Sequence, residues 1–247
     1  MEKEEFNLNI EEMIKAGLHF GHKTSKIHPK MMPYLQGVRN TVHIIDVEKT
    51  REKLSDALKF IRQLAAENKI LLLVGTKIQV KDLVKETALS CQLPYVNERW
   101  LGGTFTNFNI LRKRVDYLKE LEQKLGTPEI LKKYTKKEKA GMEEESRELK
   151  LKFGGIRNLE KFPDAIFVFD MKKDNLALKE AKAKGIKVIA ISDTNCDPTL
   201  ADYPIPANDD AISSLKYIAE KVKEAILKAK SETIENKSTK SKIQSTK

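Results

Sequence analysis

Three almost uninterrupted apolar segments most strongly restrict the folds open to this chain. They cover residues 70–74 (ILLLV), 165–169 (AIFVF) and 186–191 (IKVIAI). Strands of this kind, apolar on both faces, are typical of parallel sheets with helices packed on both sides. The intervening segments carry amphipathic helical patterns, so we predict a doubly wound α/β layer.

The amphipathic pattern is clearest in residues 49–68. Apolar residues recur there at helical spacing, at Leu54, Ala57, Leu58, Ile61 and Leu64. The predicted helices of the layer cover residues 10–16, 49–68, 80–90 and 175–184, and the predicted strands cover 43–46, 70–74, 94–96, 165–169 and 186–191.

Residues 105–153 interrupt this alternation with two long helical patterns. In 105–125 the apolar residues form a narrow seam, and a Gly-Thr-Pro turn at 126–128 precedes a highly charged helix over 136–152. Two long helices joined by such a turn predict an antiparallel coiled-coil hairpin that projects from the sheet. The hairpin has little core of its own, so two interpretations stay open: an arm that reaches a partner, or a solvated coiled coil without one.

The domain organisation follows from this insertion. Residues 1–104 and 154–228 are predicted to form one discontinuous α/β domain, with 105–153 as the inserted hairpin. Residues 229–247 are rich in Ser, Thr and Lys and nearly lack large apolar side chains. Such a composition cannot build a core, so we expect this tail to be disordered on its own.

The net charge of the 247 residues is +10, and it is unevenly distributed. Residues 105–153 hold 13 Lys/Arg against 9 Asp/Glu, and residues 228–247 hold 6 against 2, so these two segments supply +8 of the total. Segregated positive charge favours an anionic polymer such as nucleic acid, although a solvated Lys-rich surface is the usual alternative for a single cluster.

Features of secretion and disulfide bonding are missing from the pattern. The N-terminus is acidic without an apolar core, and the apolar runs are too short to span a bilayer. The two cysteines, Cys91 and Cys196, lack the paired spacing of a zinc site or a disulfide framework. We therefore expect a soluble intracellular protein with two ordinary buried thiols.

The segment 97–108 (NERWLGGTFTNF) contains the only Trp of the chain beside an Arg and a Gly pair. Glycines permit tight turns, and Trp100 with Arg99 offers stacking and charge to a polar polymer. One interpretation is a docking loop. The other is that Trp100 and the nearby Phe residues close a core beside a strand end.

Nucleotide-binding motifs are weak in this sequence, although the predicted architecture often carries nucleotides at the carboxyl ends of its strands. Neither a GxxxxGK[ST] phosphate loop nor a GxGxxG fingerprint occurs, and Gly75-Thr76-Lys77 has a single glycine. No Ser/His/Asp or Cys/His catalytic arrangement is legible either.

Several acidic residues follow the predicted strands, namely Asp170, Asp193, Asp197, Asp209 and Asp210. They could converge with His19 or His22 on a cation, because hard cations and zinc accept oxygen and imidazole ligands. We name His19, Asp193 and Asp209 as candidate ligands of a structural metal ion. The alternative is that these residues cap helices and form turns.

Five motifs in order give the chain a family resemblance. They are residues 16–31 (AGLHFGHKTSKIHPKM), 74–77 (VGTK), 95–108 (YVNERWLGGTFTNF), 153–170 (FGGIRNLEKFPDAIFVFD) and 193–211 (DTNCDPTLADYPIPANDDA). The chain resembles the bacterial ribosomal protein S2 family of the small subunit over about residues 7–228. The resemblance implies a flavodoxin-like α/β domain with a protruding coiled-coil hairpin.

The resemblance also implies a function without catalysis. A member of this family is a structural constituent of the small ribosomal subunit in the cytoplasm, requires no cofactor, and binds small-subunit rRNA on the solvent side at the junction of head and body. It neighbours other ribosomal proteins and helps to recruit the S1 protein for translation. Neither a membrane nor a small-molecule substrate is expected. Two alternatives remain open on the residues alone: a nucleotide-dependent enzyme on the same fold, and a protein-interaction adaptor.

In this family context we predict RNA contacts on two parts of the chain. The predicted contacts of the globular domain are Lys23, Lys26, Lys30, Arg39, Lys77, Arg99 and Trp100, and those of the hairpin are Arg112, Arg114, Lys132, Lys133, Lys136 and Lys137. Basic side chains would neutralise phosphates and release counterions. Each basic residue could instead be a solvated surface charge.

Overall fold

A computed structural model describes residues 6–127 and 132–244 of the chain, with side chains up to residue 233. Pro128 of the predicted hairpin turn lies outside the described residues. The helices and strands are, in chain order, α1 (Ile10–Lys15), β1 (Phe20–Lys23), β2 (Leu35–Arg39), β3 (Val42–Ile45), α2 (Val47–Ala66), β4 (Leu71–Val74), α3 (Lys81–Cys91), β5 (Tyr95–Val96), α4 (Phe108–Gly126), α6 (Lys136–Phe153), β6 (Ala165–Val168), α7 (Asn175–Ala183), β7 (Lys187–Ser192), β8 (Tyr203–Pro206) and α8 (Ile212–Gln244). No helix in the described part is long and apolar enough to cross a membrane.

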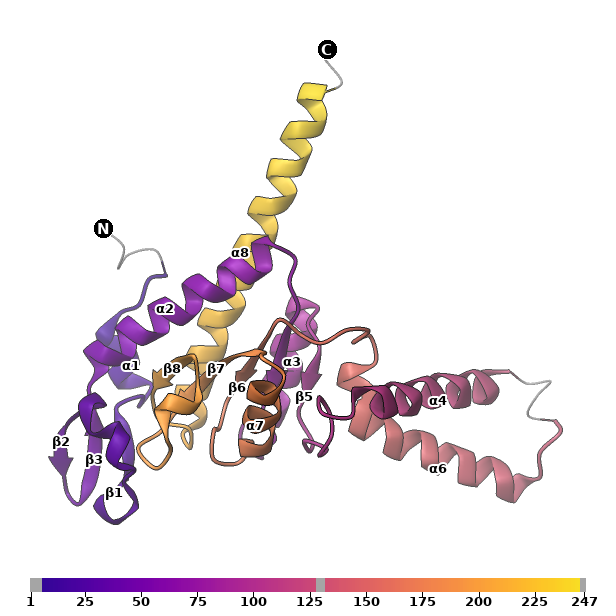
Figure 1. Cartoon of the computed structure of the whole chain (residues 1–247), viewed down its shortest axis with the longest axis horizontal. Coiled ribbons are helices and arrows are strands. Elements are labelled where there is room, and N and C mark those ends of the chain that lie inside the picture. The colour runs from indigo at the N-terminus through magenta and orange to yellow at the C-terminus, as the bar shows by residue number, and fades with distance from the viewer. Residues whose placement is uncertain (1–5, 128–131, 245–247) are drawn as a thin grey trace.

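The central sheet has five parallel strands in the order β5-β4-β6-β7-β8. Numbered by their succession in the chain, these strands give the order 2-1-3-4-5, which is the flavodoxin-like form of the doubly wound fold. The predicted α/β class is therefore confirmed. Figure 1 shows the sheet in the middle of the molecule, with the hairpin α4/α6 reaching out on one side.

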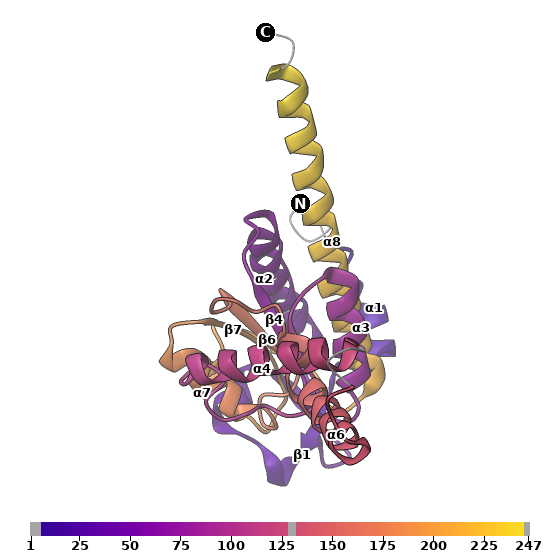
Figure 2. The same cartoon turned by 90° about the vertical axis from the view of Figure 1, so that its right-hand side faces the viewer.

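Two apolar cores lie on the two faces of this sheet. Along β4, Leu71 and Leu73 belong to the core shared with α2, α3 and α8, whereas Leu72 and Val74 belong to the other core. Successive side chains of a strand point to opposite faces, which explains why a continuous apolar run is needed here. The second core is covered by α7 and by the base of the hairpin, as Figure 2 shows.

A separate three-stranded antiparallel sheet, ordered β1-β3-β2, precedes the α/β layer. The strand predicted at 43–46 lies here as β3 and not in the parallel sheet. Thr194, after β7, holds this small sheet, because its hydroxyl accepts from the amide of His22 at 2.9 Å and its carbonyl accepts from the amide of His28 at 2.8 Å. The small sheet and the hairpin occupy opposite ends of the long axis in Figure 1.

The inserted hairpin consists of α4 and α6, which lie side by side. The seam predicted from the sequence is buried in α4 at Leu111, Val115, Leu118 and Leu121. Helix α6 begins at a capping box, in which the side chain of Thr135 and the side chain of Glu138 each bond the other residue's backbone amide.

The C-terminal segment differs from its prediction. Helix α8 continues through residues 229–244, where we expected a disordered tail from residue 229 onwards. The first turns beyond that boundary are held by contacts: Ala229 is buried, Lys230 Nζ donates to the carbonyl oxygen of Cys91 at 2.6 Å, and Glu232 pairs with Arg62 at 2.8 Å. The helix projects beyond the body of the molecule in Figure 1.

Candidate nucleic-acid interface

Three cations on the small sheet form the first candidate surface. Lys23 ends β1, Lys26 follows in a 3₁₀ turn and Arg39 ends β2; all three are exposed, and none has an ion pair within the described residues. We call them the N-terminal basic surface. The chain contains no Asp or Glu between Glu12 and Asp46, so no acid close in the sequence neutralises this surface. This acid-free stretch is a signal for the surface that can be read in the sequence itself.

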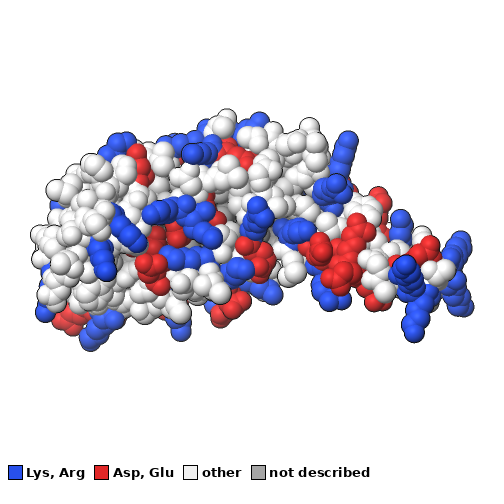
Figure 3. All heavy atoms as spheres, turned by 90° about the horizontal axis from the view of Figure 1, so that it is seen from below, with Lys and Arg blue, Asp and Glu red and all other residues white. Residues whose placement is uncertain are grey.

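The second candidate surface is the outer end of the hairpin. We call Lys132, Lys133, Lys136 and Lys137 the hairpin tip; all four are exposed and carry no ion pair in the part of the chain that the structure describes. Figure 3 shows blue side chains gathered at this end and red ones nearer the body. The exposed acids of α6 are Glu138, in its first turn, and Glu143, Glu144, Glu145 and Glu148 further along. A polyanion would therefore be attracted most strongly to the end of the arm.

Two further predicted contacts are also available to solvent. Arg99, before Trp100, and Arg114, on the first turns of α4, are exposed and unpaired among the described residues. They lie between the two basic surfaces, at the base of the hairpin and on its first helix.

Lys30 and Arg112 are bound to the protein itself. Lys30 Nζ lies 2.7 Å from Oδ2 of Asp197 and 3.0 Å from Oγ1 of Thr199. Burial works against ionisation of Asp197, but the hydrogen bond from Lys30 outweighs it and lowers the pKa of Asp197 to about 2. Arg112 Nη1 donates to the carbonyl oxygen of Leu159 at 2.8 Å, and its side chain is 25% exposed.

Lys77 sits in an acidic cluster at the carboxyl ends of the strands. Its side chain is 17% exposed, and its ammonium lies 3.1 Å from Asp170, 2.9 Å from Asp209 and 2.7 Å from Asp210. Burial disfavours the charged amine, but the hydrogen bonds to Asp210 and Asp209 outweigh burial and raise the pKa of Lys77. We therefore find in Lys77 a structural counter-ion, in contrast to the phosphate contact expected from the sequence.

His22 extends the same cluster towards the small sheet. Its Nδ1 lies 3.2 Å from Oδ1 of Asp193, and its Nε2 lies 3.5 Å from Oδ2 of Asp210 and 2.9 Å from Nδ2 of Asn195. The hydrogen bond to Asp193 raises the pKa of His22, against the opposing effect of burial. Of the predicted acids, Asp170, Asp193, Asp209 and Asp210 therefore lie together with His22 and Lys77, whereas Asp197 pairs with Lys30.

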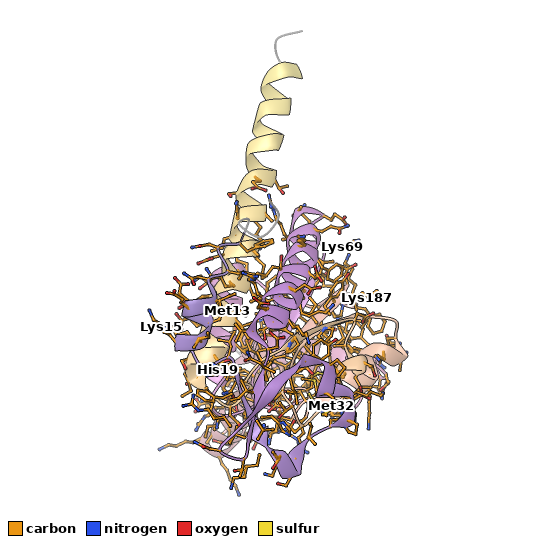
Figure 4. All side chains as sticks on the ribbon, turned by 90° about the vertical axis from the view of Figure 1, so that its left-hand side faces the viewer. Met13, Lys15, His19, Met32, Lys69 and Lys187 are labelled. Atoms are coloured by element: carbon orange, nitrogen blue, oxygen red, sulfur yellow. The ribbon has the colours of Figure 1, made fainter. Side chains whose placement is uncertain are left out.

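A metal ion is not supported at this cluster. Among the side chains described, in residues 6–127 and 132–233, no group of three or more His, Cys, Asp or Glu is arranged to hold one. Of the candidates named from the sequence, His19 lies between α1 and β1 (Figure 4), and burial lowers its pKa. Asp193 and Asp209 instead face the imidazole of His22 and the ammonium of Lys77, which supply the positive charge that a metal would bring.

The positions where this fold usually binds phosphate are filled by carboxylates. After β6, the backbone amides of Lys172 and Lys173 both donate to Oδ1 of Asp170 at 2.8 Å. After β4, the amide of Thr76 donates to Oδ2 of Asp174 at 3.1 Å. The amide groups that would cradle a nucleotide are thus already occupied, and the nearby acids would repel its phosphates.

Trp100 belongs to the core. It is 7% exposed, packs edge-on against Phe105 with ring centroids 5.0 Å apart, and its Nε1 donates to Oε1 of Glu180 at 3.3 Å. The core interpretation of this Trp is therefore the one the structure favours, and it leaves no ring face for a base. Glu180 was not identified from the sequence; its one signal is an acid on the same helical face as the buried Ala177 and Ala181.

Taken together, a flavodoxin-like domain, occupied phosphate positions and unpaired cations at both ends define a basic α/β protein suited to an extended anionic partner. The family model described as Ribosomal protein S2 matches residues 13–229. The chain therefore belongs to the ribosomal protein S2 family, whose members are structural, non-enzymatic proteins of the small ribosomal subunit.

Curated relatives agree with this assignment. The small ribosomal subunit protein uS2 of Dictyoglomus thermophilum is 45% identical over 221 residues, which make up 90% of this chain and 89% of the relative. The protein of the same name from Koribacter versatilis is 43% identical over 222 residues, covering 89% of this chain and 73% of the relative. The family predicted from the five motifs is confirmed, and the nucleotide-dependent enzyme is rejected.

Proposed function

We propose that this ribosomal protein binds small-subunit rRNA through two surfaces, the N-terminal basic surface and the hairpin tip. The supporting observation is that these seven cations are exposed and unpaired within the described residues, whereas Lys30, Lys77 and Arg112 are held by groups of the protein. Arg99 and Arg114 supply further contacts between the two surfaces.

Binding of this kind works by charge and shape. Each lysine or arginine that meets a phosphate releases condensed counterions, so affinity falls as salt rises. Folded RNA presents its phosphates in a fixed three-dimensional pattern, which a protein reads by the spacing of its cations. The two surfaces lie at opposite ends of the long axis in Figure 1, which suits them to contact separate rRNA segments at once.

The hairpin tip can be tested against a matched pair of lysines on the same helix. Lys136→Gln/Lys137→Gln removes two unpaired charges, whereas Lys150→Gln/Lys152→Gln removes two that pair with Glu122 at 3.1 Å and Glu148 at 3.1 Å. Filter binding to purified small-subunit rRNA is measured over a series of KCl concentrations.

The tip variant should bind more weakly, and the slope of log affinity against log salt should fall by about 1.5, since each phosphate contact contributes roughly 0.7–0.9. The paired-lysine variant should keep the wild-type slope. Equal slopes for the two variants would reject the tip as a phosphate-binding surface.

The proposal also includes a place at the junction of head and body on the solvent side and a part in recruiting the S1 protein, both of which rest on the family resemblance alone. Small subunits isolated from cells depleted of this chain should lack S1 when their proteins are quantified by mass spectrometry. Adding the purified chain back should restore it. Full retention of S1 in depleted subunits would reject the recruiting role.

A further inference from the structure

The base of the hairpin contains a buried carboxylate that no cation pairs with among the described residues. Glu180, on α7, is 5% exposed, and every group bonded to it comes from the loop that leads into α4. Its Oε1 accepts from Nε1 of Trp100 at 3.3 Å and from the amide of Gly103 at 2.8 Å. Its Oε2 accepts from the amides of Phe105 at 2.8 Å and Thr106 at 3.1 Å, and from the Thr106 hydroxyl at 3.3 Å.

These bonds couple one loop conformation to one side chain. A buried carboxylate without a counter-ion is costly unless several donors converge on it. Three backbone amides can do so only when the loop is folded back on itself, which Gly103 allows with a positive φ of 93°. Burial disfavours the ionised form of Glu180, yet the amide bonds prevail and lower its pKa.

The segment that leads from the hairpin back into the domain is attached at a second point. At the end of α6, Gly155 packs so closely on β5 that an added Cβ would overlap the carbonyl oxygen of Tyr95. Glu122 on α4 also accepts from Lys150 at 3.1 Å and from Arg157 at 2.8 Å, which ties the two helices to the segment that re-enters the domain. The arm is thus fixed to the body at both of its chain connections.

We propose that Glu180 is a positioning residue that sets the direction of the hairpin relative to the α/β domain. The carboxylate joins α7, which packs on the sheet, to the loop from which α4 starts. The loop keeps its conformation because the amides of Gly103, Phe105 and Thr106 all donate to this one carboxylate, and α4 starts two residues after Thr106. The hairpin therefore projects in one fixed direction from the domain and does not pivot at its base.

The consequence for RNA binding rests on the proposed function. If the N-terminal basic surface and the hairpin tip bind one rRNA, a fixed arm holds the second surface where its site lies, and the second contact becomes intramolecular. If the arm instead moved freely, that freedom would have to be lost on binding, and the loss would weaken affinity without removing any contact.

The direction of the arm is measured by the distance between two spin labels. Glu143→Cys on α6 and Lys85→Cys on α3 place labels at exposed positions outside the predicted RNA contacts, in full-length protein whose buried Cys91 and Cys196 are replaced by Ala. The Glu180→Ala variant should show a second, broader distance population, with circular dichroism verifying that the domain remains folded. The control is Glu220→Ala, which removes an exposed acid of α8 and should keep the wild-type distribution.

The Glu180→Gln variant gives a second measurement at nearly constant side-chain volume. An amide keeps one acceptor oxygen, but its NH₂ group then faces either the amide of Gly103 or those of Phe105 and Thr106. It should therefore broaden the distribution less than alanine does. A wild-type distribution in the folded Gln variant, or in both variants, would overturn the proposal.

RNA binding separates this inference from the proposed function. With purified small-subunit rRNA, Glu180→Ala should weaken affinity by about tenfold or more, since the avidity of two surfaces is reduced. If the affinity were unchanged while the distance distribution broadened, the fixed direction of the hairpin would be rejected as a determinant of binding. Absence of rRNA binding by the wild-type protein would reject the proposed function and leave the distance result standing.

Discussion

The ammonium of Lys77 lies 2.9 Å from Oδ1 of Asp209 and 2.8 Å from the carbonyl oxygen of the same residue. These bonds link the loop after β4 to the segment before α8, two parts of the chain that are 132 residues apart. In a ligand-binding member of this fold class the same edge of the sheet would be open to a phosphate. Here it is closed by a side-chain cation and its carboxylates.

Replacing this cation should destabilise the fold. Lys77→Met leaves the buried Asp170 and Asp209 without compensation, and we expect a loss of about 2–3 kcal/mol in the free energy of unfolding. Urea denaturation measures it. The control is Lys187→Met, whose partner Asp202 is 2.9 Å away but whose side chain is 57% exposed, so its loss of stability should be much smaller. Equal effects would contradict the structural role of Lys77.

The cluster should make stability depend on pH near neutrality. Burial, with repulsion from Asp193 and Asp170, raises the pKa of Asp209 to about 7. The folded state then holds a proton that the unfolded state has released above about pH 4, so this stabilisation is lost as pH rises through 7. The raised pKa of His22 acts in the same direction, because its stabilisation is present below about pH 6.5 and lost as pH rises further.

Urea unfolding between pH 5 and 8 tests this sign. Stability should fall by roughly 2 kcal/mol over that window, because the groups with lowered pKa, such as Asp197 at about 2, contribute only at much lower pH. Asp209→Asn mimics the protonated acid and should remove most of the decline. A wild-type curve that rises from pH 5 to 8 would contradict the prediction.

The N-terminal basic surface offers a matched pair of lysines four residues apart. Lys26 is exposed without an ion pair in the described residues, whereas Lys30 is bound to Asp197 at 2.7 Å. Lys26→Gln should lower the salt slope of rRNA binding by about 0.7–0.9, and Lys30→Gln should leave it unchanged. Filter binding at several KCl concentrations measures both slopes. A larger change of the salt slope for Lys30→Gln than for Lys26→Gln would instead assign the phosphate contact to Lys30.

Much of the fold could be predicted because strands buried on both faces and helices buried on one face each leave a recognisable apolar pattern in the sequence. The runs at β4, β6 and β7 are apolar at nearly every position, and helix α2 shows its buried stripe. Strands β1 and β2 were missed because they carry few buried side chains, and β8 because two prolines interrupt it. The length of α8 was not predicted, because the composition of residues 229–247 shows only that they lack large apolar side chains. It does not show the contacts that hold the first turns of α8 beyond residue 228.

The candidate site was harder to predict from the sequence, because whether a charged side chain is neutralised depends on partners far away in the sequence. Lys26 and Lys77 look alike in the sequence, yet one is exposed and the other meets acids from two distant segments. Trp100 was a candidate for stacking until the structure placed it against Phe105 and Glu180. Local pattern identifies exposed basic stretches and cannot say which cations are already neutralised.

The close approach of Gly155 to Tyr95 gives a prediction for the second attachment point of the hairpin. A Cβ at position 155 would overlap the carbonyl oxygen of Tyr95 and press on its ring. The backbone of β5 cannot move away easily, because β5 pairs with β4. We expect Gly155→Ala to lower the free energy of unfolding by about 1–3 kcal/mol, as overpacking does in a core, and urea denaturation measures the loss.

The neighbouring Gly154 isolates this effect from the general cost of changing a glycine. An added Cβ at Gly154 meets nothing within 4 Å, and its φ of −56° suits alanine, so Gly154→Ala should be neutral or slightly stabilising. The two variants differ by one position in the same turn. If both were neutral, β5 and the base of α6 would not be in tight contact, and the second attachment of the arm would have to lie in the Glu122 ion pairs alone.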